Sequence, residues 1–125
     1  MPDASDDPRR YLPLTPSVFH VLLALSDGDR HGYGIIQDVA DAIGGDVTLR
    51  TGTLYTILKR LLEERLIAES DTRPEAGEDD ERRRYYALTP LGRSVVQAEA
   101  RRLDGMVALA RSRRMLTKSA RSGER

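Results

Sequence analysis

The sequence has no cysteine and no tryptophan, and only two histidines and one phenylalanine occur among its 125 residues. Without cysteine, the chain cannot form disulfides, iron–sulfur clusters or thiolate metal sites. Two histidines and scattered acids are also a poor ligand set for a metal ion, so we expect no metal and no cofactor. The P-loop, the G-x-G-x-x-G fingerprint and the G-x-S-x-G nucleophile motif are missing as well. The sequence therefore predicts a protein that is not an enzyme.

Long apolar stretches are missing too, since no segment has the length and hydrophobicity of a transmembrane helix. The first ten residues are acidic and lack the apolar core of a signal peptide. We therefore expect a cytoplasmic protein with no membrane partner. The 20 basic and 20 acidic residues cancel. This balance argues against a generally basic protein, but it leaves room for local basic patches.

Charge is distributed unevenly along the chain. Residues 69–81 contain seven acidic residues and one arginine, and Arg82, Arg83 and Arg84 follow directly. Residues 111–125 contain six basic residues and one acidic residue. Local patches of both signs are therefore expected.

A length of 125 residues fits a single domain. Composition and periodicity divide it into four parts. We expect a flexible N-terminal arm over residues 1–12, a folded domain over residues 13–89, a long last helix over residues 90–116, and a basic disordered tail over residues 117–125.

Hydrophobic periodicity predicts three helices in the first half of the chain. Thr15 is placed to cap the first helix, with Pro16 in its first turn and Gly28 at its end. The second helix covers the segment HGYGIIQDVADAIGG and stops at Gly44 and Gly45. The apolar residues recur at helical spacing: Val18, Val21, Leu22 and Leu25 in the first helix, Ile36, Val39, Ala40 and Ile43 in the second, and Leu54, Ile57, Leu58, Leu61 and Leu62 in the third.

The third helix combines its apolar face with an opposite face of small, polar and basic residues. At about 100° per residue, that face collects Gly52, Thr53, Thr56, Lys59 and Arg60, with Tyr55 at its edge. Such a face suits close approach to a DNA groove. The alternative is an ordinary solvated face, on which the bases pair with Glu63 and Glu64.

Two short extended runs and a last helix follow. Residues 66–73 and 82–89 flank a loop of proline, glycine and acids, which predicts a β-hairpin with a long tip. Thr89 and Pro90 repeat the capping pattern of the first helix. The last helix carries an apolar seam that steps by four and three residues, as in a coiled coil: Val96, Ala100, Leu103, Val107 and Ala110.

Three helices, a hairpin and a final helix are the order of a winged helix-turn-helix, so we expect a mainly α fold with a two-stranded wing. In that fold the third helix enters the major groove. Threonine hydroxyls can bond phosphates or base edges, and basic side chains neutralise phosphates. The arginines at 82–84 would reach the DNA backbone from the wing; the alternative is that they neutralise the acids at 78–81. The contacts expected from the third helix and the wing are Thr51, Gly52, Thr53, Tyr55, Thr56, Lys59, Arg60, Arg82, Arg83 and Arg84.

Four segments together resemble the PadR-type transcriptional regulators: LTPSVFHVLLAL, HGYGIIQDV, GTLYTILKRLLEERLI and RRRYYALTPLGR. The resemblance covers roughly residues 14–109. It implies a homodimeric repressor whose last helix crosses to the partner subunit. Carried over by position, it assigns DNA contacts to Tyr33, Thr53, Tyr55 and Lys59 and a basic wing entry to Arg83 and Arg84, with Tyr86 as an accompanying aromatic residue. The chain departs from many relatives at Gly34, where they have a larger residue, and in its short C-terminal part.

The same resemblance implies a response to a small hydrophobic or aromatic effector. Tyr11, Phe19 and Met106 are the residues that could line its pocket, although plain core packing would account for them equally well. A different class of function is a winged-helix protein-interaction module. Such a module should present large apolar anchors on the third helix. Thr, Gly and basic residues stand there instead, so the sequence favours double-stranded DNA as the partner.

Overall fold

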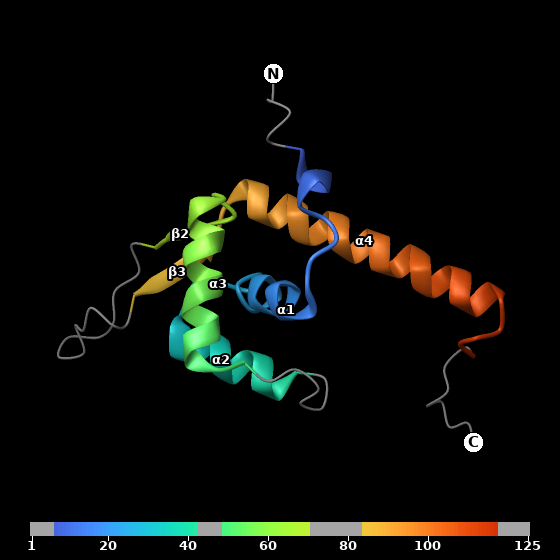
Figure 1. Ribbon diagram of the computed structural model, residues 1–125, viewed down its shortest axis with the longest axis horizontal. Coiled ribbons are helices and arrows are strands. Elements are labelled where there is room, and N and C mark those ends of the chain that lie inside the picture. Colours follow the sequence, from blue (N-terminus) through green and yellow to red (C-terminus); the bar gives the residue numbers. More distant parts are fainter. Residues whose placement is uncertain (1–6, 43–48, 71–83, 118–125) are drawn as a thin grey trace.

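The computed structural model describes residues 7–42, 49–70 and 84–117. The first of three short helices packs against a long last helix, the second packs against the first and the third, and a small sheet lies next to the third helix (Figure 1). The mainly α winged helix-turn-helix expected from the sequence is therefore confirmed. The elements in chain order are η2 (Pro8–Tyr11), α1 (Pro16–Ala24), β1 (Arg30–His31), α2 (Gly32–Asp41), α3 (Thr51–Glu63), β2 (Ile67–Glu69), β3 (Tyr85–Leu88) and α4 (Pro90–Ser112).

The apolar faces of α1 and α3 form the centre of the core, as their periodicity predicts. In α1 and its C-cap, Val18, Val21, Leu22 and Leu25 are all buried. In α3, Leu54, Leu58 and Leu61 are buried, while Ile57 and Leu62 are half-buried against the same cluster. Removing such side chains from water is the main term that holds a small domain together.

The buried face of α2 differs from the prediction by one position. Ile35 and Val39 are buried, whereas Ile36 is half-buried and Ala40 is exposed. Ile43 lies outside the described residues, as do the two glycines expected to end the helix. Because Ile35 and Ile36 are adjacent, spacing alone could not decide which of them faces the core. The packing of α2 on α1 and α3 selects Ile35.

Threonine caps begin α1 and α4 as expected. Oγ1 of Thr15 accepts a hydrogen bond from the amide of Val18 at 3.2 Å, and Oγ1 of Thr89 accepts one from the amide of Gly92 at 2.9 Å. Each cap satisfies an amide that has no partner inside its helix. A proline follows each cap in the first helical turn.

Both of these helices end earlier than the sequence suggested. The first stops at Ala24, and Gly28, with a φ of 153°, lies in the connection to β1. The last stops at Ser112, because Arg114 turns left-handed with a φ of 63° and the amide of Met115 bonds back to the carbonyl of Ala110 at 2.9 Å. That pairing is a common way to end a helix.

The sheet has three strands in the order β1-β3-β2, so the two-stranded expectation was incomplete. The hairpin pair is antiparallel, with Ile67 opposite Leu88, and β1 adds Arg30 opposite Tyr86. Two residues are too few to show the alternation that marks a strand in sequence. The prediction therefore missed β1, which ties the start of α2 to the wing.

Residues 7–12, expected to be part of a flexible arm, instead contain a short 3-10 helix. Residues 7–12 are not a free segment: η2 begins with Asp7 as its cap and packs against α4. Tyr11 and Leu12 are half-buried against the core. Packing against α4 thus accounts for the structure of residues 7–12. Residues 1–6 lie outside the described residues.

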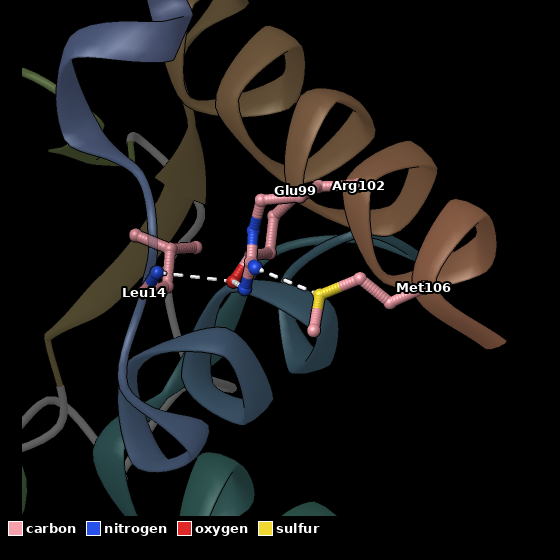
Figure 2. Close-up of polar contacts among 4 residues, drawn as sticks. All are labelled: Leu14, Glu99, Arg102 and Met106. Atoms are coloured by element: carbon pink, nitrogen blue, oxygen red, sulfur yellow. Dashed lines mark hydrogen bonds and ion pairs between the residues drawn. The ribbon is translucent and has the colours of Figure 1, made fainter. Parts of the chain in front are cut away.

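A buried carboxylate attaches the segment before α1 to the middle of α4 (Figure 2). Glu99 is 1% exposed. Its Oε2 accepts a hydrogen bond from the amide of Leu14 at 3.0 Å, and Arg102 donates to both of its oxygens, at 2.6 and 2.9 Å. Arg102 also reaches the sulfur of Met106 at 3.2 Å. The hydrogen bonds from Arg102 hold the pKa of Glu99 below its usual range, although burial opposes them.

The start of α4 lies directly on the turn that follows α3. The amide of Thr89 donates to the carbonyl of Leu66 at 3.1 Å, and its hydroxyl donates to the carbonyl of Arg65 at 2.7 Å. Gly92 lies so close that a Cβ there would be 1.9 Å from the Leu66 oxygen. Val95 is buried in the same core. The division expected at residue 90 therefore does not separate two packing units.

Candidate nucleic-acid interface

The outer face of α3 is exposed along its length, opposite the face that is buried in the core. This helix lies at one side of the molecule, away from the projecting half of α4 (Figure 1). The exposed residues include every α3 residue that the sequence assigned to DNA: Thr51, Gly52, Thr53, Tyr55, Thr56, Lys59 and Arg60.

Gly52 has no packing role within the described chain. A Cβ at this position would meet no atom within 4 Å. The neighbouring hydroxyl of Thr56 donates to the carbonyl of Gly52 at 3.1 Å, which leaves its oxygen free to accept. This part of the helix therefore presents a polar surface without large protruding side chains, as close approach to a groove requires.

The two bases of α3 differ in their surroundings. Arg60 pairs with Glu64 at 3.3 Å, so the alternative of a solvated, self-paired face holds for this residue. Both side chains remain partly exposed, and such pairs contribute little free energy. Lys59 is exposed and has no ion pair among the described residues. Lys59 is thus the base best placed to meet an external anion.

The start of α2 brings two aromatic rings beside this face. Nδ1 of His31 accepts a hydrogen bond from the amide of Gly34 at 3.0 Å, so His31 is the cap of α2. Its ring stacks near Tyr33, with centroids 6.4 Å apart, and meets the edge of Tyr85 at 5.3 Å. Tyr33 is 70% exposed, which fits a side chain available for contact.

Only part of the wing lies in the described chain. Arg84 forms an ion pair with Glu69 at 3.0 Å across the two strands, rather than projecting unpaired. Arg82, Arg83 and the acids at 78–81 lie outside the described residues. Tyr86 is 6% exposed and belongs to the core. Burial raises the pKa of Tyr86, and the nearby charges of Tyr55 and Glu69 raise it further.

The Tyr55 side chain reaches from α3 to the start of α2. The side chain is 41% exposed. Its hydroxyl lies over Gly32, at the start of α2, where a Cβ would be only 2.6 Å away. The sequence analysis did not single out Gly32, because only the folded chain places it beneath an aromatic ring.

The predicted seam on α4 divides into a buried start and an open continuation. Val96 is buried in the core of its own chain, together with Val95 and Glu99. The later seam residues lie along the half of α4 that extends beyond the other helices (Figure 1). There Ala100 and Val107 are exposed, while Leu103 and Ala110 are half-buried. Met106, Leu109 and Leu116 add further exposed apolar surface.

The three residues expected to line an effector pocket differ in their exposure. Tyr11 and Phe19 are half-buried against the core, and Met106 is 56% exposed on α4. An open hollow does lie between η2 and α4, but none of the three lines it. The hollow is lined by Asp7, Pro8, Arg9, Leu12, Ala98, Arg101 and Arg102.

Within the described ranges, no cluster of three or more metal-ligating side chains occurs, and no helix is long and apolar enough to cross a membrane. The described surface thus offers exposed polar and basic side chains on α3 and an open apolar stripe on α4.

Comparison with known proteins identifies the chain's relatives. Residues 21–98 match the profile of the Transcriptional regulator PadR-like family. An uncharacterized 37.1 kDa protein in transposon TN4556 of Streptomyces fradiae is 39% identical over 90 residues. That match covers 70% of this chain but 24% of the relative. The chain therefore spans about a quarter of the relative's length.

Two solved structures share the fold. Bacillus subtilis PadR, in complex with operator DNA, aligns at a TM-score of 0.57 and 21% identity, over 67% of this chain and 46% of that one. Bordetella bronchiseptica BpsR, whose DNA binding is regulated by 6-hydroxynicotinic acid, aligns at 0.58 and 24%, over 89% and 69%. At these identities the likeness establishes the fold.

Proposed function

Because the chain belongs to the PadR-like family of transcriptional regulators, we propose that it binds a specific DNA sequence and represses transcription in the cytoplasm. The family consists of regulators and not enzymes. The observation that carries the proposal is the two-sided character of α3. One side is buried in the core, and the other exposes small, polar and basic residues with a single large ring at its edge.

The alternative of a protein-interaction module receives less support from that face. Protein interfaces depend on a few large anchors, chiefly aromatic residues and arginine. On α3 these would be Tyr55 and Arg60, and Arg60 is engaged with Glu64. Thr51, Gly52 and Thr53 occupy the first turn instead. The operator-bound Bacillus subtilis relative adds support for DNA as the partner.

In the proposed mode, α3 lies in the major groove and the wing meets the adjacent backbone. Lys59, Arg60 and the wing arginines supply most of the affinity, because they neutralise phosphates. Thr53 and Thr56 contribute to base choice through hydroxyl and methyl contacts. Tyr33 and Tyr55 contact the DNA beside them.

The protein acts as a homodimer in this proposal, joined through the open half of α4. The face of α4 that is buried near Val96 continues as an apolar stripe past the end of the core, at Leu103, Val107 and Ala110. A second copy of the stripe would cover it. A two-fold dimer then requires an inverted-repeat operator, with half-sites about 10 bp apart or a multiple of that spacing.

The proposal includes release from DNA by a small hydrophobic or aromatic effector. That part rests on the regulation of Bordetella bronchiseptica BpsR by 6-hydroxynicotinic acid. A thermal-shift screen with flat aromatic acids tests it. A panel that changes neither the melting temperature nor operator affinity contradicts it.

Lys59→Ala tests the proposed function directly. Fluorescence anisotropy is measured for a duplex enriched from a randomised pool by the wild-type protein, and for a scrambled duplex, at several salt concentrations. We expect the wild type to prefer the enriched duplex and to lose affinity steeply with salt. The variant should bind both duplexes more weakly, with a salt slope reduced by about one.

Glu63→Ala is the matched control, because Glu63 is exposed on the same helix but is an acid. Its salt slope should not fall. If the wild-type protein enriches no sequence and binds both duplexes equally, the proposal of a sequence-specific regulator is wrong. A change of sequence preference in Lys59→Ala would mean that Lys59 contacts bases rather than phosphates.

Val107→Asp tests the dimer. A charge in the middle of an apolar seam must be desolvated on association, which costs several kcal/mol in a site without a partner. Val107 is 40% exposed, so the variant chain should still fold. Sedimentation equilibrium should show monomers where the wild type shows dimers. Arg101→Asp, at an exposed position off the seam, should remain dimeric; a dimeric Val107→Asp would place the interface elsewhere.

A further inference from the structure

The side-chain position of Gly32, the first residue of α2, is occupied by the ring of Tyr55. A Cβ on Gly32 would lie 2.6 Å from the Tyr55 hydroxyl oxygen and 3.0 Å from Cζ of the ring. Non-bonded carbon contacts normally lie near 3.5–4.0 Å. The ring therefore extends from α3 across the start of α2 and rests on its backbone.

The backbone of α2 does not itself require glycine at this position. Among the described glycines, only Gly28 has a positive φ. Alanine would also favour a helix more than glycine does. Gly32 is also buried. Its glycine is therefore not explained by a position in an exposed turn. The room needed by Tyr55 is the feature in the fold that excludes a side chain here.

Tyr55 faces both the interior and the proposed DNA surface. On its inner side its hydroxyl lies over the buried Gly32 at the start of α2. On its outer side 41% of the residue is exposed, close to the expected contact residues Thr51 and Thr56 of α3. The depth at which the ring rests on α2 therefore sets how far it projects.

We propose that Gly32 is a positioning residue for DNA recognition, which acts through Tyr55 and touches no base itself. Because Gly32 has no side chain, the Tyr55 ring can lie directly on the backbone of α2. At that depth the ring does not keep α3 from the groove. This inference rests on the proposed function. Functional sites commonly need such supporting contacts to keep the contacting group within a fraction of an ångström of its place.

Gly32→Ala is the first test. The added methyl collides with the outer end of a partly exposed side chain, so the ring can rotate outward and the chain should keep nearly its wild-type melting temperature. The displaced ring then keeps α3 from the groove. We expect affinity for the enriched duplex to fall by about tenfold, with a smaller loss on the scrambled duplex.

A double-mutant cycle separates this role from a general structural one. Tyr55→Ala and the double variant Gly32→Ala/Tyr55→Ala are measured on the same two duplexes. If Gly32 acts through Tyr55, adding Gly32→Ala to Tyr55→Ala changes affinity no further. Gly34→Ala is the matched control, because its Cβ would meet the His31 ring at 3.6 Å and Cβ of Arg30 at 3.8 Å, both ordinary contact distances. It should bind as the wild type does.

The outcomes distinguish this inference from the proposed function. A wild-type protein without sequence preference would overturn the proposed function, and the inference with it. If the wild type is specific and Gly32→Ala binds equally well, the inference alone is wrong. It is also wrong if Gly32→Ala weakens binding as much without Tyr55 as with it. A nuclear Overhauser contact between the Gly32 α-protons and the Tyr55 ring, lost in Tyr55→Ala, checks the packing without DNA.

Discussion

Gly92→Ala is expected to lower the free energy of unfolding by about 3 kcal/mol, a large fraction of the total stability of a small domain. The added Cβ would lie 1.9 Å from the carbonyl oxygen of Leu66. That oxygen is backbone and already accepts the amide of Thr89. It cannot rotate away as a side chain could. The start of α4 would have to move off the turn after α3, and Val95 would leave the core with it.

Urea denaturation followed by circular dichroism measures this loss, and Gly105→Ala is its control. Both glycines lie in α4, but nothing lies within 4 Å of a Cβ at Gly105. Alanine there should therefore raise stability by about 1 kcal/mol through helix propensity. The two substitutions are chemically identical and should act in opposite directions. Equal effects would mean that the contact between Gly92 and Leu66 does not constrain the fold.

Glu99→Ala is expected to cost about 2 kcal/mol, because it removes the acceptor of three hydrogen bonds from a buried site. The amide of Leu14 loses the acceptor that Glu99 provides, and Arg102 loses its carboxylate. The Arg102 side chain is 35% exposed and can turn toward water. This exposure keeps the cost below that of breaking a fully buried ion pair. Asp104→Ala, at an exposed site on the same helix, should have little effect.

The same carboxylate should make stability depend on pH. The pKa of Glu99 is lowered in the folded state, chiefly by the hydrogen bonds from Arg102. The folded chain thus binds the proton less readily than the unfolded chain does. The stabilisation is complete above the unfolded pKa of glutamate and is lost as pH falls through the lower folded pKa.

Unfolding free energies at a series of acidic pH values test this dependence. Wild type and Asp104→Ala should lose stability together as the pH falls. Glu99→Ala should begin lower and change less over the same range. If Glu99→Ala follows the wild-type curve in parallel, the carboxylate does not carry the dependence.

Local chemistry made much of the architecture predictable. A threonine cap followed by proline marks the starts of α1 and α4, because the cap satisfies an amide that has no partner within the helix. The spacing of Leu54, Leu58 and Leu61 marks the inner face of α3, because 3.6 residues per turn place them on one side. The same periodicity places the residues that we propose as DNA contacts on the exposed side of α3.

Features that depend on contacts between distant segments could not be predicted in this way. The two-residue strand β1 exists because β3 lies beside it. The short helix within residues 7–12 packs against α4, which lies far from it in the sequence. The choice between Ile35 and Ile36 depends on how α2 packs. None of these has a signal within its own stretch of sequence.

By itself, then, the sequence determined the inner faces of α1 and α3, the threonine caps and the winged-helix order, because these follow from periodicity and from hydrogen bonds between neighbours in the chain. Tertiary structure alone decided which glycines are indispensable. Gly32, Gly92 and Gly105 look alike in sequence, yet the first lies under Tyr55, the second lies against the carbonyl of Leu66, and the third has open space around it. The physical reason is steric: the consequence of a missing side chain depends on which atoms the fold brings to that place.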